Sequence, residues 1–109
     1  MNSKPVFALP EVAADLAVAA AHYQSWRSDG KEHILRKYDE TVGWIARNPG
    51  LFPRKFGAIR RAVLKQSYYI VYFLDEIDRN LVLAVLDGRR SPHEIRGILR
   101  GRRAIGSTS

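Results

Sequence analysis

The residues best suited to chemistry are two adjacent arginines, Arg89 and Arg90. They follow the apolar run LVLAVL at residues 81–86, which has the composition of a buried strand. They precede Ser91-Pro92-His93-Glu94, whose residue types are those of a helix start. A guanidinium group binds phosphate or carboxylate through two parallel hydrogen bonds, and the free N–H groups of a helix N-terminus add donors. The stretch therefore predicts an anion-binding site between a strand and a helix.

Further arginines extend this positive surface. Residues 88–103 contain six arginines and one acid, Glu94. Upstream, Arg60 and Arg61 are neighbours on a predicted strand, so their side chains point to opposite faces and at most one of them can join the set. The residues predicted to contact an anionic target are Arg60, Arg89, Arg90, Arg96 and Arg100.

The charge is open to two interpretations. Residues 1–46 hold five Lys/Arg and six Asp/Glu, whereas residues 47–109 hold thirteen and five. Such asymmetry is typical of a protein that meets nucleic acid or an acidic partner. The alternative is a solvated basic surface, in which Arg89 pairs with Asp87 or Asp78 and the pair Arg96 and Arg100 is simply hydrated.

Other catalytic and metal-binding patterns do not occur in the sequence. It has no cysteine, no GxGxxG and no phosphate-binding loop, and its three histidines, His22, His33 and His93, lie in different predicted elements. We therefore expect no metal and no cofactor. His22 and His33 are interpreted as surface residues of helices.

The length of 109 residues and the hydrophobic content of 46% are those of one globular domain spanning residues 1–109. Residues 103–109 are predicted to be a flexible tail. Glu11 and Asp15 interrupt the mildly apolar N-terminal stretch, so we expect neither a signal peptide nor a membrane span and assign the protein to the cytoplasm.

Apolar periodicity predicts the elements that position these residues. Residues 4–9 form a first strand, and Pro10-Glu11 begins an alanine-rich helix that Ser28-Asp29-Gly30 interrupts. Asp29 and Glu32 have the spacing of a capping box for a second helix, which ends at Asn48-Pro49-Gly50. The two helices are expected to pack as an antiparallel hairpin.

The remaining chain is predicted to be mostly strand. Residues 59–65, 67–73 and 81–86 are rich in β-branched and aromatic residues, and residues 51–57 form a loop before them. A last helix begins at Ser91-Pro92 and stops at Gly101. The prediction is an α+β fold of order β-α-α-β-β-β-α, with the helical hairpin packed on one face of a small, mostly antiparallel sheet.

The run IRRAVLKQSYYIVYFLDEIDRNLVLAVLDGRRSP resembles the RelE/ParE superfamily of bacterial type II toxins. PEVAADLAVAAAHY is similar to the first helix of that family, and IARNPGLFP is similar to the end of its second. The resemblance extends over residues 6–100 and rests on the order and spacing of these pieces. It implies the compact toxin fold of the family and a cognate antitoxin that binds and neutralises this chain in a hetero-oligomer.

The family contains two activities. RelE-like toxins cleave mRNA on the ribosome, which requires charge stabilisation and proton transfer. Arg61 and Arg90 match the cationic positions of that branch, and His93 would replace its C-terminal tyrosine, because no tyrosine follows Tyr72. Asp87 stands where many relatives have histidine. These two departures favour the ParE-like branch, whose members act on DNA gyrase.

Two alternatives to a gyrase inhibitor remain. One is the ribosome-dependent endoribonuclease, with the ribosome and mRNA as partners, and the other is a non-toxic basic binding module. Antitoxin binding is assigned to amphipathic side chains that can line an apolar groove, namely Tyr23, Trp26 and Trp44. Core packing is the alternative role of each of these three.

Overall fold

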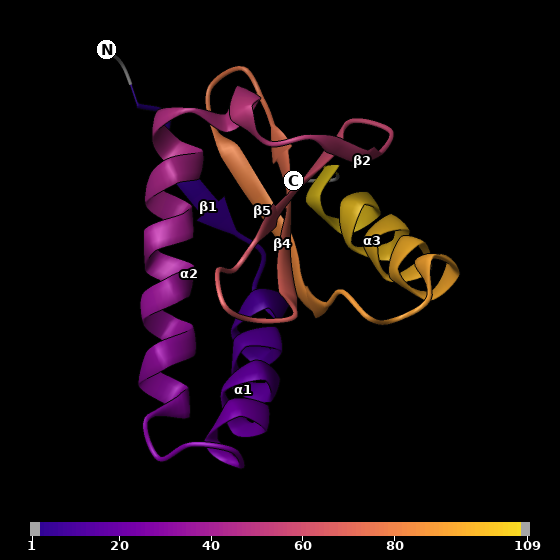
Figure 1. Cartoon of the computed structure of the whole chain (residues 1–109). Coiled ribbons are helices and arrows are strands. Elements are labelled where there is room, and N and C mark those ends of the chain that lie inside the picture. The colour runs from indigo at the N-terminus through magenta and orange to yellow at the C-terminus, as the bar shows by residue number, and fades with distance from the viewer. Residues whose placement is uncertain (1–2, 108–109) are drawn as a thin grey trace.

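A five-stranded sheet with the strand order β1-β5-β4-β3-β2 carries the fold (Figure 1). The computed structural model describes residues 3–107. β1 runs parallel to β5, and every other neighbouring pair of strands is antiparallel. The elements are β1 (Val6–Ala8), α1 (Glu11–Gln24), α2 (Gly30–Arg47), η1 (Pro49–Leu51), β2 (Arg54–Phe56), β3 (Ile59–Val63), β4 (Tyr69–Asp75), β5 (Asn80–Asp87) and α3 (Pro92–Ser107).

The α+β class and the predicted order of elements are confirmed. The short strand β2 lies within the segment 51–57 that the sequence analysis assigns to a loop, and η1 overlaps that segment only at Leu51. In the described part of the chain, no helix is both long and apolar enough to cross a membrane.

α1 and α2 form the predicted antiparallel hairpin, and at Gly30 the first residue of α2 lies directly against the backbone at the end of α1. A Cβ atom at Gly30 would lie 2.3 Å from the backbone carbonyl carbon of Tyr23, so only glycine fits there. The predicted capping box of Asp29 and Glu32 is wrong, since Asp29 makes no side-chain cap. Its carboxylate instead accepts a hydrogen bond of 2.9 Å from Nη2 of Arg27.

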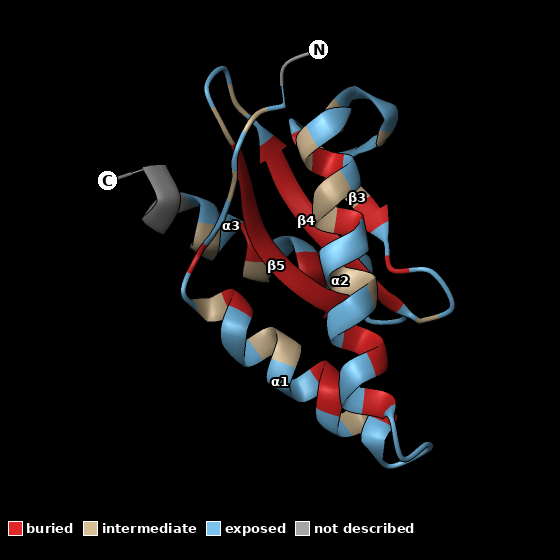
Figure 2. Ribbon diagram, turned by 90° about the vertical axis from the view of Figure 1, so that its left-hand side faces the viewer, coloured by how far each residue is buried: buried red, intermediate tan, exposed pale blue. Residues whose placement is uncertain are grey.

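The core lies on both faces of β4 and β5. The pairing register puts Arg60 opposite Phe73 on one face and Arg61 opposite Tyr72 on the other. The hairpin covers the first face, where the ring of Tyr69 lies 6.0 Å from that of Tyr23. α3 lies against the opposite face (Figures 1 and 2). The uninterrupted burial of residues 81–86 follows from this double cover.

β1 covers only the first part of the outer edge of β5, because its pairing with β5 ends at Val82. Beyond that point Asp15 of α1 accepts a hydrogen bond of 2.9 Å from the backbone N–H of Val85. Arg102 of α3 donates one of 3.1 Å to the carbonyl of Leu83 and one of 2.9 Å from Nη2 to Oδ1 of Asp15. This Asp15–Arg102 pair therefore supplies donors and acceptors that a strand would otherwise supply, and it ties α3 to α1.

α3 begins as predicted but extends further than predicted. The Ser91 hydroxyl accepts a hydrogen bond of 3.1 Å from the Glu94 N–H. The helix then continues through Gly101 to Ser107, so the predicted stop at Gly101 is wrong. Ile95 and Leu99, both buried, hold one side of the helix on the sheet. Residues 108–109 of the predicted tail lie outside the described residues.

Candidate functional site

Arg89 is held at the end of β5 by Asp87. The Asp87 carboxylate accepts hydrogen bonds from Nε and Nη2 of Arg89, at 3.0 and 2.8 Å, and from its backbone N–H at 2.9 Å. The guanidinium also lies 4.1 Å from the centre of the Tyr68 ring. The hydrogen bonds from Arg89 hold the pKa of Asp87 below its usual range. The local pair that the sequence analysis left open as an alternative is thus formed.

Arg90, the next residue, pairs instead with Glu94, and its Nη1 lies 3.4 Å from Oε2 of that carboxylate. Both side chains are exposed, and the contact joins Arg90, two residues before α3, to the first turn of that helix. An ion pair of this kind is screened by solvent and contributes little to stability. Breaking the Arg90–Glu94 pair therefore costs little free energy, so Arg90 is able to bind an incoming anion in place of Glu94.

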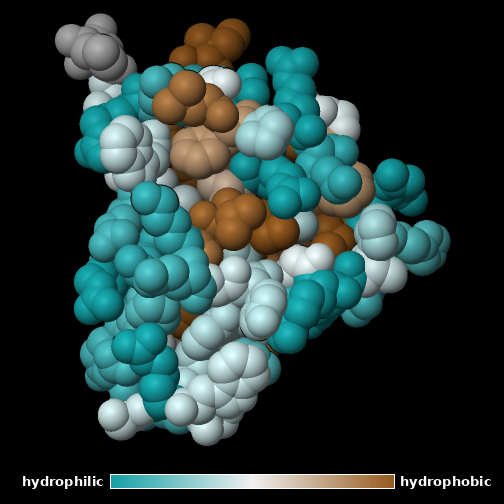
Figure 3. Space-filling model, viewed as in Figure 1, coloured by the Kyte–Doolittle hydropathy of each residue, from teal (hydrophilic) through white to brown (hydrophobic). Residues whose placement is uncertain are grey.

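A groove of about 570 Å³ opens between β2 and α3. Its floor is apolar and includes Phe56, Ile59 and Leu99. We call it the basic groove because its walls carry four cations, Lys55, Arg96, Arg100 and Arg103. Figure 3 shows apolar surface in the middle of this side of the molecule, with hydrophilic surface to the right of it.

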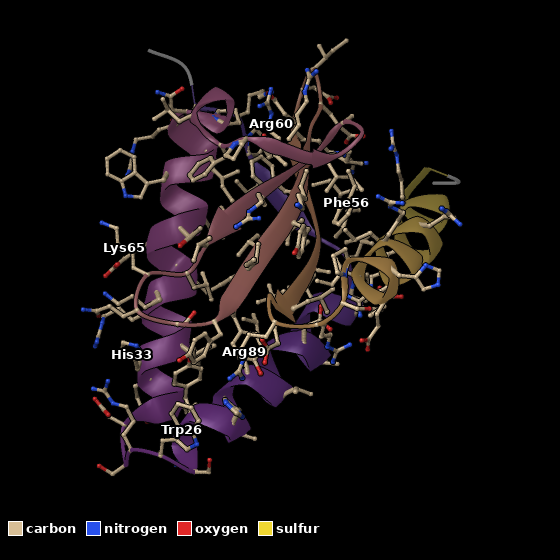
Figure 4. The ribbon with its side chains drawn as sticks, turned by 45° about the vertical axis from the view of Figure 1, so that its right-hand side comes forward. Trp26, His33, Phe56, Arg60, Lys65 and Arg89 are labelled. Atoms are coloured by element: carbon tan, nitrogen blue, oxygen red, sulfur yellow. The ribbon has the colours of Figure 1, made fainter. Side chains whose placement is uncertain are left out.

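Two of the cations lie against Phe56. The Arg96 guanidinium carbon is 5.3 Å from the ring centre, and Lys55 Nζ is 5.9 Å from it. Phe56 projects from β2 toward α3 (Figure 4) and lies 6.2 Å from the ring of Tyr72. Among the described residues, no carboxylate forms an ion pair with any of the four cations of the groove.

The predicted arginines do not form one cluster. Arg60 lies on the hairpin face, where it donates a hydrogen bond of 2.7 Å to the Phe52 carbonyl and lies 3.8 Å from Asp75. Arg89 is bound to Asp87, as described above. Arg96 and Arg100 share the basic groove, and Arg90 precedes the same helix.

The three residues assigned to a ribonuclease site come from separate places. Arg61 is on β3 opposite Tyr72, whereas Arg90 and His93 flank the start of α3. In the part of the chain that the structure describes, no hydrogen bond or ion pair joins these three side chains to one another. Burial raises the pKa of Tyr72, which makes this tyrosine a poor proton donor at neutral pH.

The three aromatic residues assigned to antitoxin binding also differ in their surroundings. Tyr23 is buried, and its hydroxyl accepts a hydrogen bond of 3.0 Å from the Tyr68 N–H. Trp26 and Trp44 are 61% and 53% exposed. Trp26 borders a hollow of about 460 Å³ at the tip of the hairpin, whereas Trp44 lies near the other end of α2, with Arg47 against its ring.

The sequence analysis did not assign Lys55, Phe56 or Arg103 of the basic groove to the predicted contact residues, and it misplaced one histidine. Lys55 and Phe56 lie in the segment that was predicted to be a loop. The sequence carried one signal for a binding role there, namely two adjacent cations, Arg54 and Lys55, directly before an aromatic residue. His33 is buried beside Tyr23, so its prediction as a surface residue is wrong. The described residues include no group of three acidic or histidine side chains that could hold a metal ion.

Neither a family model nor a curated protein matches this sequence. A solved structure is similar, namely a chain of the chromosomal ParDE TA system from P. aeruginosa, with a TM-score of 0.62 and 18% sequence identity. The match covers 76% of this chain and 94% of that chain. The strands and helices described above therefore form a RelE/ParE-like toxin fold.

Proposed function

We propose that this chain is the toxin of a bacterial type II toxin-antitoxin system and that it is a ParE-like inhibitor of DNA gyrase. The fold and its similarity to a chain of a ParDE system support the toxin assignment. In this proposal the toxin acts in the cytoplasm and is kept inactive by a cognate antitoxin.

The gyrase branch rests on one observation, namely that the arginines lack an oriented group for proton transfer. Asp87 is committed to Arg89, and Tyr72 is buried with a raised pKa. His93 is exposed, and no hydrogen bond within the described part of the chain orients it. Phosphodiester cleavage needs a positioned proton donor or acceptor as well as cations, whereas inhibition by binding needs only the cations and a complementary surface.

The antitoxin is assigned to the hairpin side of the molecule. Trp26 is a large exposed aromatic beside a hollow, which is the kind of residue that anchors a binding partner. Trp44 offers a second anchor near the other end of α2. Tyr23 contributes to the wall of the Trp26 hollow rather than to an exposed contact.

The test is to induce the protein without its antitoxin and to follow plasmid supercoiling and translation in parallel. We expect supercoiling to change and the DNA-damage response to rise before protein synthesis falls. Prompt loss of translation with cut transcripts would instead establish the ribonuclease, and His93→Ala or Arg90→Ala should then abolish toxicity. If induction did not affect growth, both toxin activities would be excluded and the non-toxic basic binding module would be the remaining alternative.

A further inference from the structure

The basic groove has the chemistry of a site for a single nucleic-acid strand. We propose that an unpaired strand lies along α3, with its phosphates on Arg96, Arg100, Arg103 and Lys55 and with one base against Phe56. This inference deepens the proposed function, on which it rests for the identity of the strand as DNA, and it names a ligand of the toxin itself.

The first argument is the arrangement of charge. Arg96 and Arg100 are one helical turn apart, about 6 Å along the axis of α3, and Arg103 follows three residues later. They therefore form a row that a chain of phosphates can follow. The described residues provide no carboxylate partner for this row, so its charge is open to an external anion.

The second argument is the floor of the groove. Phe56, Ile59 and Leu99 present an apolar surface between the cations, and the planar guanidinium of Arg96 lies over the Phe56 ring. Strand-binding proteins combine such a basic track with aromatic rings on which bases stack. In a duplex the bases are stacked on one another and cannot reach this floor, so the floor favours an unpaired strand.

The test measures binding of fluorescent dT12 to the purified chain by anisotropy, with U12 and a 12-base-pair duplex in parallel. Arg96→Gln/Arg100→Gln should raise the Kd for dT12 at least tenfold. It should also reduce the slope of log K against log salt by about 1.4, since two phosphate contacts are lost. Phe56→Leu should weaken binding about fivefold or more with little change in that slope.

A matched control separates this groove from general positive charge. Lys31→Gln/Arg36→Gln removes the same charge from exposed positions of α2 on the hairpin side and should change the Kd less than twofold. If this control lost as much affinity for dT12 as the groove variant does, or if the duplex bound more tightly than dT12, the inference would be overturned. Tighter binding of U12 than of dT12 would overturn the assignment to DNA. Denaturation midpoints of all variants must match that of the parent chain before the comparison is made.

The outcome is distinguishable from that of the proposed function. If dT12 does not bind but induction still changes supercoiling, the groove inference is wrong and the gyrase proposal stands. If dT12 binds as described but supercoiling is unaffected, the gyrase proposal is wrong. If poly-glutamate displaced dT12 at concentrations similar to those at which dT12 itself binds, the occupant of the groove would be an acidic protein segment. That result would also overturn the inference.

Discussion

Asp87 is the residue whose role the structure changes most. On sequence alone it is an anion that would repel a phosphate, in a position where the toxins that this sequence resembles often have histidine. In the structure its charge is matched by Arg89, which it also orients over the Tyr68 ring. The Asp87–Arg89 pair is thus a local structural unit at the end of β5, and it leaves Asp87 unable to act as a proton carrier.

The lowered pKa of Asp87 predicts a pH dependence. A carboxyl whose pKa is lower in the folded than in the unfolded state stabilises the fold above its unfolded pKa, and this contribution is lost as pH falls through the folded pKa. Arg89→Gln should therefore move the Asp87 pKa, measured by NMR titration, up toward its ordinary value. It should also reduce the acid-induced loss of stability. An unchanged pKa in this variant would show that Arg89 is not the cause.

The Asp15–Arg102 pair predicts a larger effect, because its side chains are only 10% and 18% exposed. Arg102→Gln leaves the Asp15 charge and the Leu83 carbonyl without their main partner. We expect the free energy of unfolding to fall by about 2 kcal/mol, measured by urea denaturation. Arg103→Gln, on the exposed side of the same turn, is the control and should have little effect; equal stability of the two variants would contradict the proposed role.

The sequence predicted the charge of the site but not the contacts of side chains whose partners are distant in the chain. The positive charge of residues 88–103 could be predicted directly from the sequence. A pair between Arg89 and Asp87 could also be predicted, because these residues are only two positions apart in the chain. The hydrogen-bond partner of Arg60 could not be predicted. Its acceptor is the backbone carbonyl of Phe52, which comes near only because of the path of the chain into β2. Likewise, His33 has the local pattern of a surface position and is buried because Tyr23 packs against it.

At the scale of elements, two glycines have opposite roles in their helices. Gly30→Ala would place Cβ against the backbone of Tyr23 and Gln24, and neither can move without separating α1 from α2. We expect a loss of about 3 kcal/mol in unfolding free energy. Gly101→Ala meets no atom within 4 Å and lies inside α3, so it should stabilise the protein by about 0.5 to 1 kcal/mol.

Circular dichroism and denaturation of both variants check this pair of predictions. If Gly101→Ala destabilised the protein, or raised its helix content by extending the helix, α3 of the parent chain would end near Gly101, as the sequence pattern indicates. The pattern was misleading here because a glycine costs a helix only about 1 kcal/mol. The bonds that Arg102 makes to Asp15 and Leu83 offset that cost. In contrast, the predicted strand 81–86 lies within β5 and the predicted strand 67–73 overlaps β4, which begins and ends two residues later, because composition and burial agree along most of both strands.

At the scale of the whole molecule, the sheet separates the two surfaces to which we assign the antitoxin and the target. The hairpin side carries the exposed Trp26 at its tip, and the opposite side carries Phe56 and the basic groove (Figure 4). The sheet between them is rigid, because β4 and β5 are buried along almost their whole length. An antitoxin on one side and a target on the other would therefore contact different residues.

This separation predicts independent effects on the two partners. Trp26→Ala should weaken binding of the antitoxin, taken as the product of the adjacent gene, at least tenfold by calorimetry, because an exposed aromatic anchor is lost. Arg96→Gln/Arg100→Gln should abolish toxicity but leave antitoxin affinity within about twofold, and the combined variant should show additive effects. Trp44→Ala tests whether the antitoxin also reaches the far end of α2. If the groove variant weakened antitoxin binding as much as Trp26→Ala does, the antitoxin would cover the α3 side as well, and neutralisation would be direct competition for the basic groove.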